Sequence, residues 1–297
     1  MSTFLNDMKI GVTLKYYSVL LVIILAGSLA YTSKAAEVPA VNTSLPAKFP
    51  FSVGEQLIYR IYWGIIPVGQ TIIKTEWIEE NGKKLLAIRY RTFTNRIFDT
   101  IYPVDDTAES IVTPETFLPI RFSFLLTRRR SRTERTVSFD HANLKAVMAS
   151  TATGQTNEFE IASDTRDIIS FLYYSRSSEL QPYQTRHCRV VADTGILDMK
   201  LKTYDYENVN IPPFGKVQSL RLDPIAKLDT LTVENGKVMS WIAKERCLAT
   251  KMTIDAPLAN VSIELREVNG PGADSWSKAM QKAHPDRKNA PLTTSHE

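Results

Sequence analysis

Apolar and polar residues alternate along most of the chain between residues 49 and 268, which is the pattern of half-buried β-strands. In residues 57–63, for example, Tyr59, Ile61 and Trp63 share one face, and Arg60 lies on the other. The same pattern predicts strands over residues 68–77, 85–93, 102–112, 120–127, 133–139, 144–149, 158–162, 188–192, 196–204, 216–222, 238–243, 249–254 and 261–268.

One segment, residues 166–176, has helical periodicity instead. Ile168, Phe171 and Leu172 fall on one face of such a helix, which predicts that this face packs on a sheet. Asp164 is the expected N-cap, and Arg176 suits the negative end of the helix dipole.

Many strands and one helix predict an all-β fold. Turns such as Asn81-Gly82 connect antiparallel neighbours, so we expect a curved antiparallel sheet or an open, half-closed β-barrel with one packed α-helix. A curved sheet covered by a helix has a concave apolar face.

The first 35 residues have the pattern of a secretory signal peptide. Basic residues precede an uncharged apolar run at 16–31, and Ser33 and Ala35 suit cleavage after Ala35. The alternative is an uncleaved membrane anchor, although the run is shorter than the roughly 20 residues that span a bilayer. Cleavage would leave a periplasmic chain with no transmembrane segment. We expect a linker at 36–48, a β-rich domain at 49–268 and a flexible C-terminal tail at 269–297.

Charge and cysteine content narrow the partners only slightly. The net charge is +4, and the signal segment contributes half of it, so the remainder is nearly neutral and nucleic acid is not an expected partner. Cys188 and Cys247 would meet an oxidising compartment. Whether they form a disulfide or stay separate is open, as is the oligomeric state.

The sequence lacks the usual signatures of catalysis. It has no motif for a nucleophile, a zinc site or a phosphate-binding loop. The carboxylates Asp105 and Asp106 are adjacent on a predicted strand, so they should point to opposite faces; with Glu109 they offer too few ligands for a calcium loop. We therefore expect no enzyme activity, no cofactor and no metal.

Two sets of residues are candidates for binding. The first is an apolar pocket for a lipid or glycolipid, although the same residues would also suit a packed core; its members are Tyr59, Ile61, Trp63, Tyr173 and Trp241. The second is a basic hairpin that could contact anionic headgroups or glycans, although it could also be a solvated turn; its members are Arg128, Arg130 and Arg132.

Four ordered blocks of this sequence resemble the bacterial family called domain of unknown function 3108. The blocks are Phe51-x-x-Gly54-Glu55-x-Leu57-x-Tyr59 with Trp63-Gly64, Pro114-Glu-Thr-Phe117-x-Pro119-x-Arg-Phe122, Asp167-x-x-Ser170-x-x-Tyr173-Tyr174-x-Arg176, and Gly236-x-Val238-x-x-Trp241 with Arg246. The resemblance implies an exported, β-rich protein without an assigned activity. In the first block, we expect Gly54 to turn the chain into the first strand and Glu55 to bind backbone N–H groups.

Two functional hypotheses follow. The first is a non-catalytic periplasmic envelope protein that binds a hydrophobic or amphipathic ligand, a lipid or glycolipid, in the cavity of a curved sheet. The alternative is a structural or adaptor protein of the cell envelope that binds a protein or glycan partner through a sheet edge.

Overall fold

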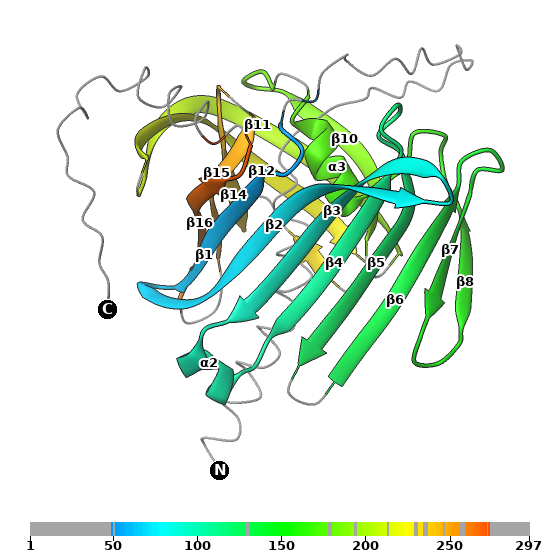
Figure 1. Cartoon of the computed structure of the whole chain (residues 1–297). Helices are drawn as coiled ribbons and strands as arrows, with labels where there is room; N and C mark the ends of the chain where they lie inside the picture. The colour runs from blue at the N-terminus through cyan, green and yellow to red at the C-terminus, as the bar shows by residue number, and fades with distance from the viewer. Residues whose placement is uncertain are drawn as a thin grey trace.

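The computed structural model describes residues 49, 51–128, 131–177, 180–192, 195–212, 214–228, 231–233, 237–245, 247–255, 259–271 and 273. Its strands form one large sheet that curves but does not close (Figure 1). The predicted all-β fold, a curved antiparallel sheet with a packed helix, is confirmed.

The first half of the sheet is an antiparallel meander of eight strands. They are β1 (Gln56–Trp63), β2 (Ile66–Glu80), β3 (Lys83–Thr94), β4 (Asp105–Val112), β5 (Pro119–Arg128), β6 (Ser131–Asp140), β7 (Lys145–Ser150) and β8 (Thr156–Glu160). Each pairs with its neighbours in sequence, so β8 lies at one edge of the sheet.

The second half runs back to the first strand. It consists of β9 (Arg166–Asp167), β10 (Thr185–Ala192), β11 (Gly195–Ile211), β12 (Gly215–Leu228), β13 (Leu231–Val233), β14 (Val238–Ala243), β15 (Leu248–Ile254) and β16 (Val261–Asn269). The last strand, β16, pairs antiparallel with β1, from Gln56 opposite Asn269 to Trp63 opposite Val261. The two ends of the domain therefore meet in the middle of the sheet.

The helix α3 (Ile168–Ser175) lies between the two halves of the curved sheet (Figure 1). Its N-cap is Asp167, whose side chain accepts hydrogen bonds from the backbone N–H groups of Ile169 and Ser170. The prediction of Asp164 as the cap was wrong. Residues 166 and 167 pair with β10 as the short parallel strand β9, so the helix cannot begin before them.

A second helix, α2 (Arg96–Ile101), connects β3 to β4 and was not predicted. Asn95 is its N-cap and accepts hydrogen bonds from the N–H groups of Ile97 and Phe98. The strand expected over residues 102–112 consequently begins only at Asp105. The signal was present in the sequence, because Asn is among the preferred N-cap residues.

One hydrophobic core occupies the concave face and joins both halves of the sheet. The inward positions of β1, Leu57, Tyr59 and Ile61, belong to it together with buried residues of α3, of β10 to β12 and of β14 to β16. The core thus lies between the two halves of one sheet, as expected for a half-barrel.

Candidate functional site

A buried ion pair lies inside the half-barrel, at the end that α3 covers. Glu55 just precedes β1, and Arg176 is the C-cap of α3. The guanidinium donates two hydrogen bonds to the carboxylate, Nη1 to Oε1 at 2.5 Å and Nη2 to Oε2 at 3.0 Å. Both side chains are almost fully buried. Glu55 therefore binds Arg176, and not the backbone N–H groups that the sequence suggested.

Aromatic rings surround this pair. The rings of Phe51 and Tyr173 meet edge to face with centroids 4.8 Å apart, and the guanidinium of Arg176 lies 5.2 Å and 5.1 Å from their centroids. Burial lowers the pKa of Arg176, but the adjacent Glu55 carboxylate more than offsets this, so the net effect is a raised pKa. This ion pair thus has no net charge, and apolar groups enclose it.

A second buried carboxylate fixes the start of α3. Besides capping the helix, Asp167 accepts hydrogen bonds from the hydroxyls of Ser110 on β4, at 2.6 Å, and of Ser170, at 2.7 Å. Burial raises the pKa of Asp167, and the hydrogen bonds from Ser110 and Ser170 oppose that rise. Asp167 therefore ties α3 to the sheet through β4, as Arg176 ties it through the segment before β1.

Three buried tyrosines, Tyr59, Tyr90 and Tyr173, belong to this core, and they differ in their partners. The hydroxyl of Tyr59 donates to the backbone carbonyl of Ala249 at 2.9 Å, across the sheet. Within the described part of the chain, the buried hydroxyls of Tyr90 on β3 and of Tyr173 on α3 have no hydrogen-bond partner. Burial raises the pKa of Tyr90 well above its usual value, and Tyr59 and Tyr173 add to the rise. The Tyr90 hydroxyl is therefore a protonated donor, and a buried donor without an acceptor is rare.

On β3 and β4, the inward side chains become slightly more exposed with distance from α3. Along the inner face of β3 the exposed fraction rises from 0% at Ile88 to 3% at Tyr90 and 8% at Thr92. The same trend holds on β4, where Ser110 is fully buried and Ala108 is not. On these two strands of the first half, the inward side chains are therefore slightly less buried toward the end opposite α3, with Tyr90 between Thr92 and the fully buried Ile88.

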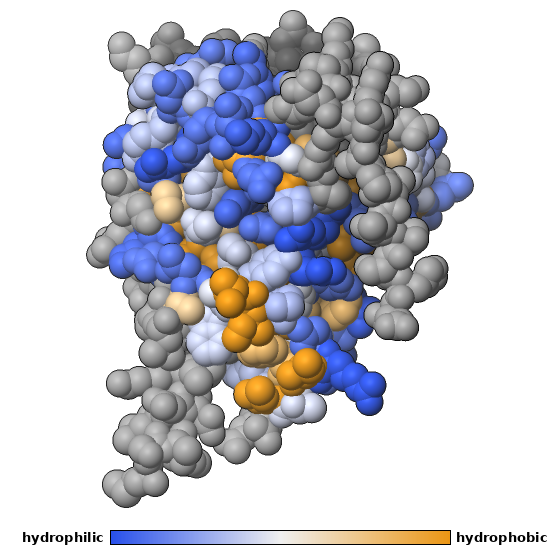
Figure 2. Space-filling view, turned by 90° about the vertical axis from the view of Figure 1, so that its left-hand side faces the viewer, coloured by the Kyte–Doolittle hydropathy of each residue, from blue (hydrophilic) through white to orange (hydrophobic). Residues whose placement is uncertain are grey.

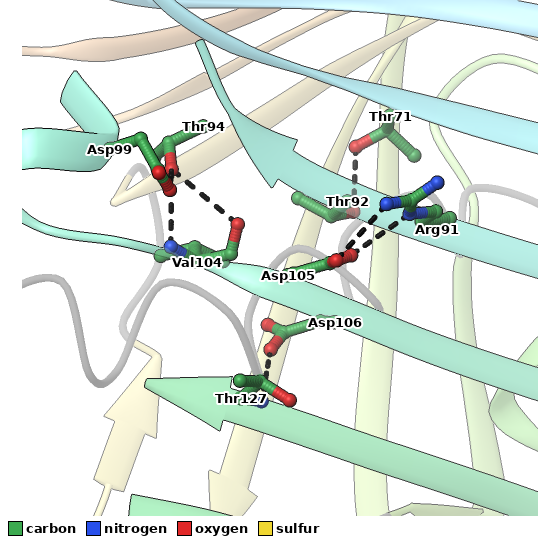
Figure 3. A network of polar contacts seen from close by, with 9 residues as sticks. All are labelled: Thr71, Arg91, Thr92, Thr94, Asp99, Val104, Asp105, Asp106 and Thr127. Atoms are coloured by element: carbon green, nitrogen blue, oxygen red, sulfur yellow. Dashed lines mark hydrogen bonds and ion pairs between the residues drawn. The ribbon is translucent and has the colours of Figure 1, made fainter. Parts of the chain in front are cut away.

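Polar side chains at this end of the half-barrel are held by specific contacts (Figure 3). The hydroxyls of Thr71 and Thr92 are 2.8 Å apart. The buried carboxylate of Asp106 accepts from the backbone N–H of Thr127 at 3.0 Å, whereas the neighbouring Asp105 forms an exposed ion pair with Arg91 (Figure 3). Asp105 and Asp106 thus point to opposite faces, as their adjacency on a strand predicts.

The structure brings four of the five predicted pocket residues together. Tyr59 and Ile61 are buried on the concave face, Trp63 is partly buried against the same core, and Tyr173 reaches it from α3. It does not bring Trp241 to them. In β14 the buried positions alternate with Trp241, which lies on the outer face and donates from Nε1 to Glu207.

The predicted basic hairpin connects β5 to β6. Arg128 ends β5, and Arg132 lies on β6, where it is exposed and 3.7 Å from Glu134. Arg130 and the side chain of Arg128 lie outside the described residues. The hairpin position is confirmed by the pairing of Arg128 with Ser131.

Sequence reasoning missed the Glu55–Arg176 pair and the unpartnered hydroxyl of Tyr90. A signal existed for the first, because Glu55 is in phase with Leu57 and Tyr59, the inward positions of β1. An acidic residue in an inward phase predicts a buried partner. No comparable signal existed for Tyr90, since an unsatisfied hydroxyl depends on packing across several strands.

Other candidate chemistry has little support among the described residues. No cluster of three His, Cys, Asp or Glu side chains in them could hold a metal ion. In the same ranges, no helix has the length and apolar character needed to cross a membrane. The side chain of Cys188 is outside the described part, so whether Cys188 and Cys247 form a disulfide stays open.

Comparisons with known proteins point to a family rather than to an activity. A search of curated proteins finds no matching relative. Among solved structures, the fold is similar to a β-barrel-like protein of the domain of unknown function DUF1849 from Brucella abortus, with a TM-score of 0.48, 10% identity, and 73% of this chain and 97% of that chain covered.

Two further structures are similar at lower scores. One is a predicted lipoprotein from Parabacteroides distasonis, with a TM-score of 0.35, 8% identity and coverage of 76% and 100% of the two chains. The other is a predicted exported protein with a YmcC-like fold from Bacteroides fragilis, with a TM-score of 0.32, 7% identity and coverage of 75% and 98%. At the level of sequence, a family model matches residues 58–266, and the chain belongs to that family, Protein of unknown function (DUF3108).

Proposed function

We propose that this protein is a non-catalytic periplasmic protein of the cell envelope that binds an amphipathic ligand inside the half-barrel. The observation that carries the proposal is the buried hydroxyl of Tyr90, a donor without an acceptor among the described residues. It sits in an apolar interior, among the inward side chains of β3. An unsatisfied buried donor costs about 1–3 kcal/mol, and a ligand acceptor would remove that cost.

The chemistry of the interior favours a neutral group at this position. The charges of Glu55 and Arg176 cancel within their own pair, and Tyr90 offers a protonated donor. An ester or amide carbonyl matches such a donor, because it accepts a hydrogen bond and brings no charge to be desolvated. An acyl chain attached to it would lie against the apolar residues of the concave face, so the favoured ligand is a lipid with an acyl linkage.

The sequence supports the location in the periplasm, through the leader pattern of residues 1–35. It also supports the absence of catalysis, because no catalytic motif occurs in the chain. The site of the proposed ligand contains Tyr59, Ile61, Trp63 and Tyr173 from the predicted pocket, together with Tyr90.

The test is native mass spectrometry of protein purified from its own envelope fraction, followed by organic extraction. We expect an additional mass that corresponds to an acylated lipid. Tyr90→Phe should lower the ligand-bound fraction severalfold without unfolding the protein, whereas Tyr183→Phe, a change on an exposed ring, should leave it unaltered. A wild-type protein that carries no ligand and takes up none from lipid extracts would refute the proposal.

The alternative, an adaptor that binds a partner through a sheet edge, has one structural feature in its favour. Strand β8 lies at an edge of the sheet and is mostly exposed. Its charged residues Glu158 and Glu160 are of the kind that discourages strand addition, and Glu158 is paired with Lys145 at 2.6 Å. A ligand-free mass together with a cross-link from β8 to an envelope protein would favour this alternative.

A further inference from the structure

Four isoleucines are exposed at the end of the sheet opposite α3. Ile65 and Ile66 lie at the β1–β2 turn and are 94% and 50% exposed; Ile97 and Ile101 lie on α2 and are 72% and 57% exposed. We call this set the apolar edge. Figure 2 shows hydrophobic groups gathered on the lower part of the face that carries the β1–β2 turn and α2.

The two parts of the apolar edge are fixed next to each other. Asn95, the N-cap of α2, donates from its backbone N–H to the carbonyl of Val68 at 2.9 Å and from Nδ2 to that of Pro67 at 2.5 Å. These bonds hold α2 beside the start of β2. Thr94, the last residue of β3, also contacts Asp99 on α2 and Val104 just before β4, so both ends of the α2 segment are fixed (Figure 3).

Arginines lie at the same end. Strand pairing puts the β5–β6 hairpin, with Arg128 opposite Ser131, at the same end of the first half as α2. Arg132 in this hairpin is exposed. Arg96 in the first turn of α2 is exposed too, and it forms no ion pair with any described residue. Two exposed acids at this end are paired, Asp105 with Arg91 and Glu134 with Arg132 at 3.7 Å, and the carboxylate of Asp99 on α2 accepts a hydrogen bond from the hydroxyl of Thr94.

We propose that the apolar edge, flanked by Arg96 and Arg132, docks onto the surface of an anionic lipid bilayer. Exposure of such large apolar side chains to water is unfavourable, and their transfer to the boundary between headgroups and acyl chains is favourable. Arginines beside them attract phosphate headgroups, so apolar and basic residues complement two layers of the same surface. A protein partner would need an acidic rim to match the same arginines.

The location of the apolar edge determines which end of the half-barrel would face the bilayer. It lies at the end toward which the inward side chains of β3 and β4 become less buried, so a docked protein would present this end of the half-barrel to the bilayer. This inference goes beyond ligand binding, and the two can fail separately, because vesicle binding and the retention of a bound lipid are different measurements.

The test uses flotation with two kinds of vesicle, phosphatidylcholine alone and an equal mixture of phosphatidylcholine and phosphatidylglycerol. We expect the protein to bind the mixed vesicles more tightly. Replacing Ile65→Asp together with Ile97→Asp should weaken binding at least about tenfold. Both positions are exposed, so the fold should persist, as circular dichroism would check. The matched control is Leu144→Asp, an exposed apolar residue in the turn at the opposite end.

The charge contribution has its own pair of variants. Arg96→Gln with Arg132→Gln should abolish the preference for phosphatidylglycerol, whereas Lys83→Gln with Lys216→Gln, exposed lysines at the other end of the strands, should keep it. Vesicle binding that is absent, or equal in the isoleucine variant and the wild type, would overturn the proposal. The proposal would also be overturned if light scattering showed a dimeric wild type and a monomeric isoleucine variant, because the apolar edge would then be a protein interface.

Discussion

The carboxylate of Glu55 accepts hydrogen bonds from both terminal nitrogens of Arg176, a residue 121 positions later in the chain. The bond links the segment that enters β1 to the end of α3. It therefore fixes the helix between the two halves of the sheet. Two ordered blocks of the family resemblance, the one with Glu55 and the one with Arg176, meet at this contact.

Breaking this pair should be costly. Arg176→Met or Glu55→Met leaves one buried charge without its partner, and we expect either change to lower the free energy of unfolding by about 3–5 kcal/mol. The double variant should recover most of the loss, because no charge is then buried. Urea denaturation checks this. Lys145→Ala, which removes an exposed ion pair, is the control and should cost less than about 1 kcal/mol. Single variants as stable as the control would contradict a structural role for the pair.

The pKa of Asp167 predicts a pH dependence. Because burial raises it in the folded state, the folded protein holds this proton at pH values where the unfolded chain has lost it. Stability from Asp167, relative to Asp167→Asn, should thus fall as the pH rises from about 4 through the folded-state pKa. Asparagine keeps the N-cap, so the difference reports ionisation. A difference that grows with pH would show that the ionised form is the one stabilised.

Tyr59 and Tyr90, both buried, provide a matched comparison. Tyr59→Phe removes the bond to the carbonyl of Ala249 and should cost about 1–3 kcal/mol of unfolding free energy. Tyr90→Phe removes an unpartnered hydroxyl from the ligand-free protein and should be neutral or slightly stabilising. Thermal and urea unfolding of delipidated protein would distinguish them. Equal losses in both variants would mean that Tyr90 has a partner.

The backbone of Gly270, just after β16, closely approaches that of Gly54, just before β1. Gly270 has a φ of +84°, and a Cβ there would lie 2.3 Å from the carbonyl oxygen of Gly54. Gly270→Ala should destabilise the protein by at least about 2 kcal/mol. Gly82→Ala is the control, since its φ of +71° is similar but nothing lies within 4 Å of the added Cβ. Unfolding midpoints that shift equally would show that the contact with Gly54 is unimportant.

Alternation along the strands was enough to predict the fold class and most strands. It placed Tyr59, Ile61 and Trp63 on one face of β1 because local periodicity determines which face a side chain occupies. The same reasoning did not place Trp241 correctly relative to them, since alternation does not tell which of two faces is the concave one. In β14 it is the face of Ser240 and Ile242 that is buried.

Features that depend on distant contacts could not be predicted. The start of α3 moved to Ile168 because residues 166–167 pair with β10, a parallel contact that no local pattern indicates. The apolar edge was invisible for a similar reason. Ile65 and Ile97 are 32 positions apart, and they share a surface only because Asn95 binds the chain at Pro67 and Val68.

The most direct test of the account is an experimental structure of protein purified from its own envelope fraction, with the density on the concave face beside Tyr90 as the measurement. We predict an elongated density between the two halves of the sheet, with an acceptor atom within about 3 Å of the Tyr90 hydroxyl. Protein side chains or isolated waters filling that space, with the hydroxyl bonded to one of them, would contradict ligand binding in the half-barrel.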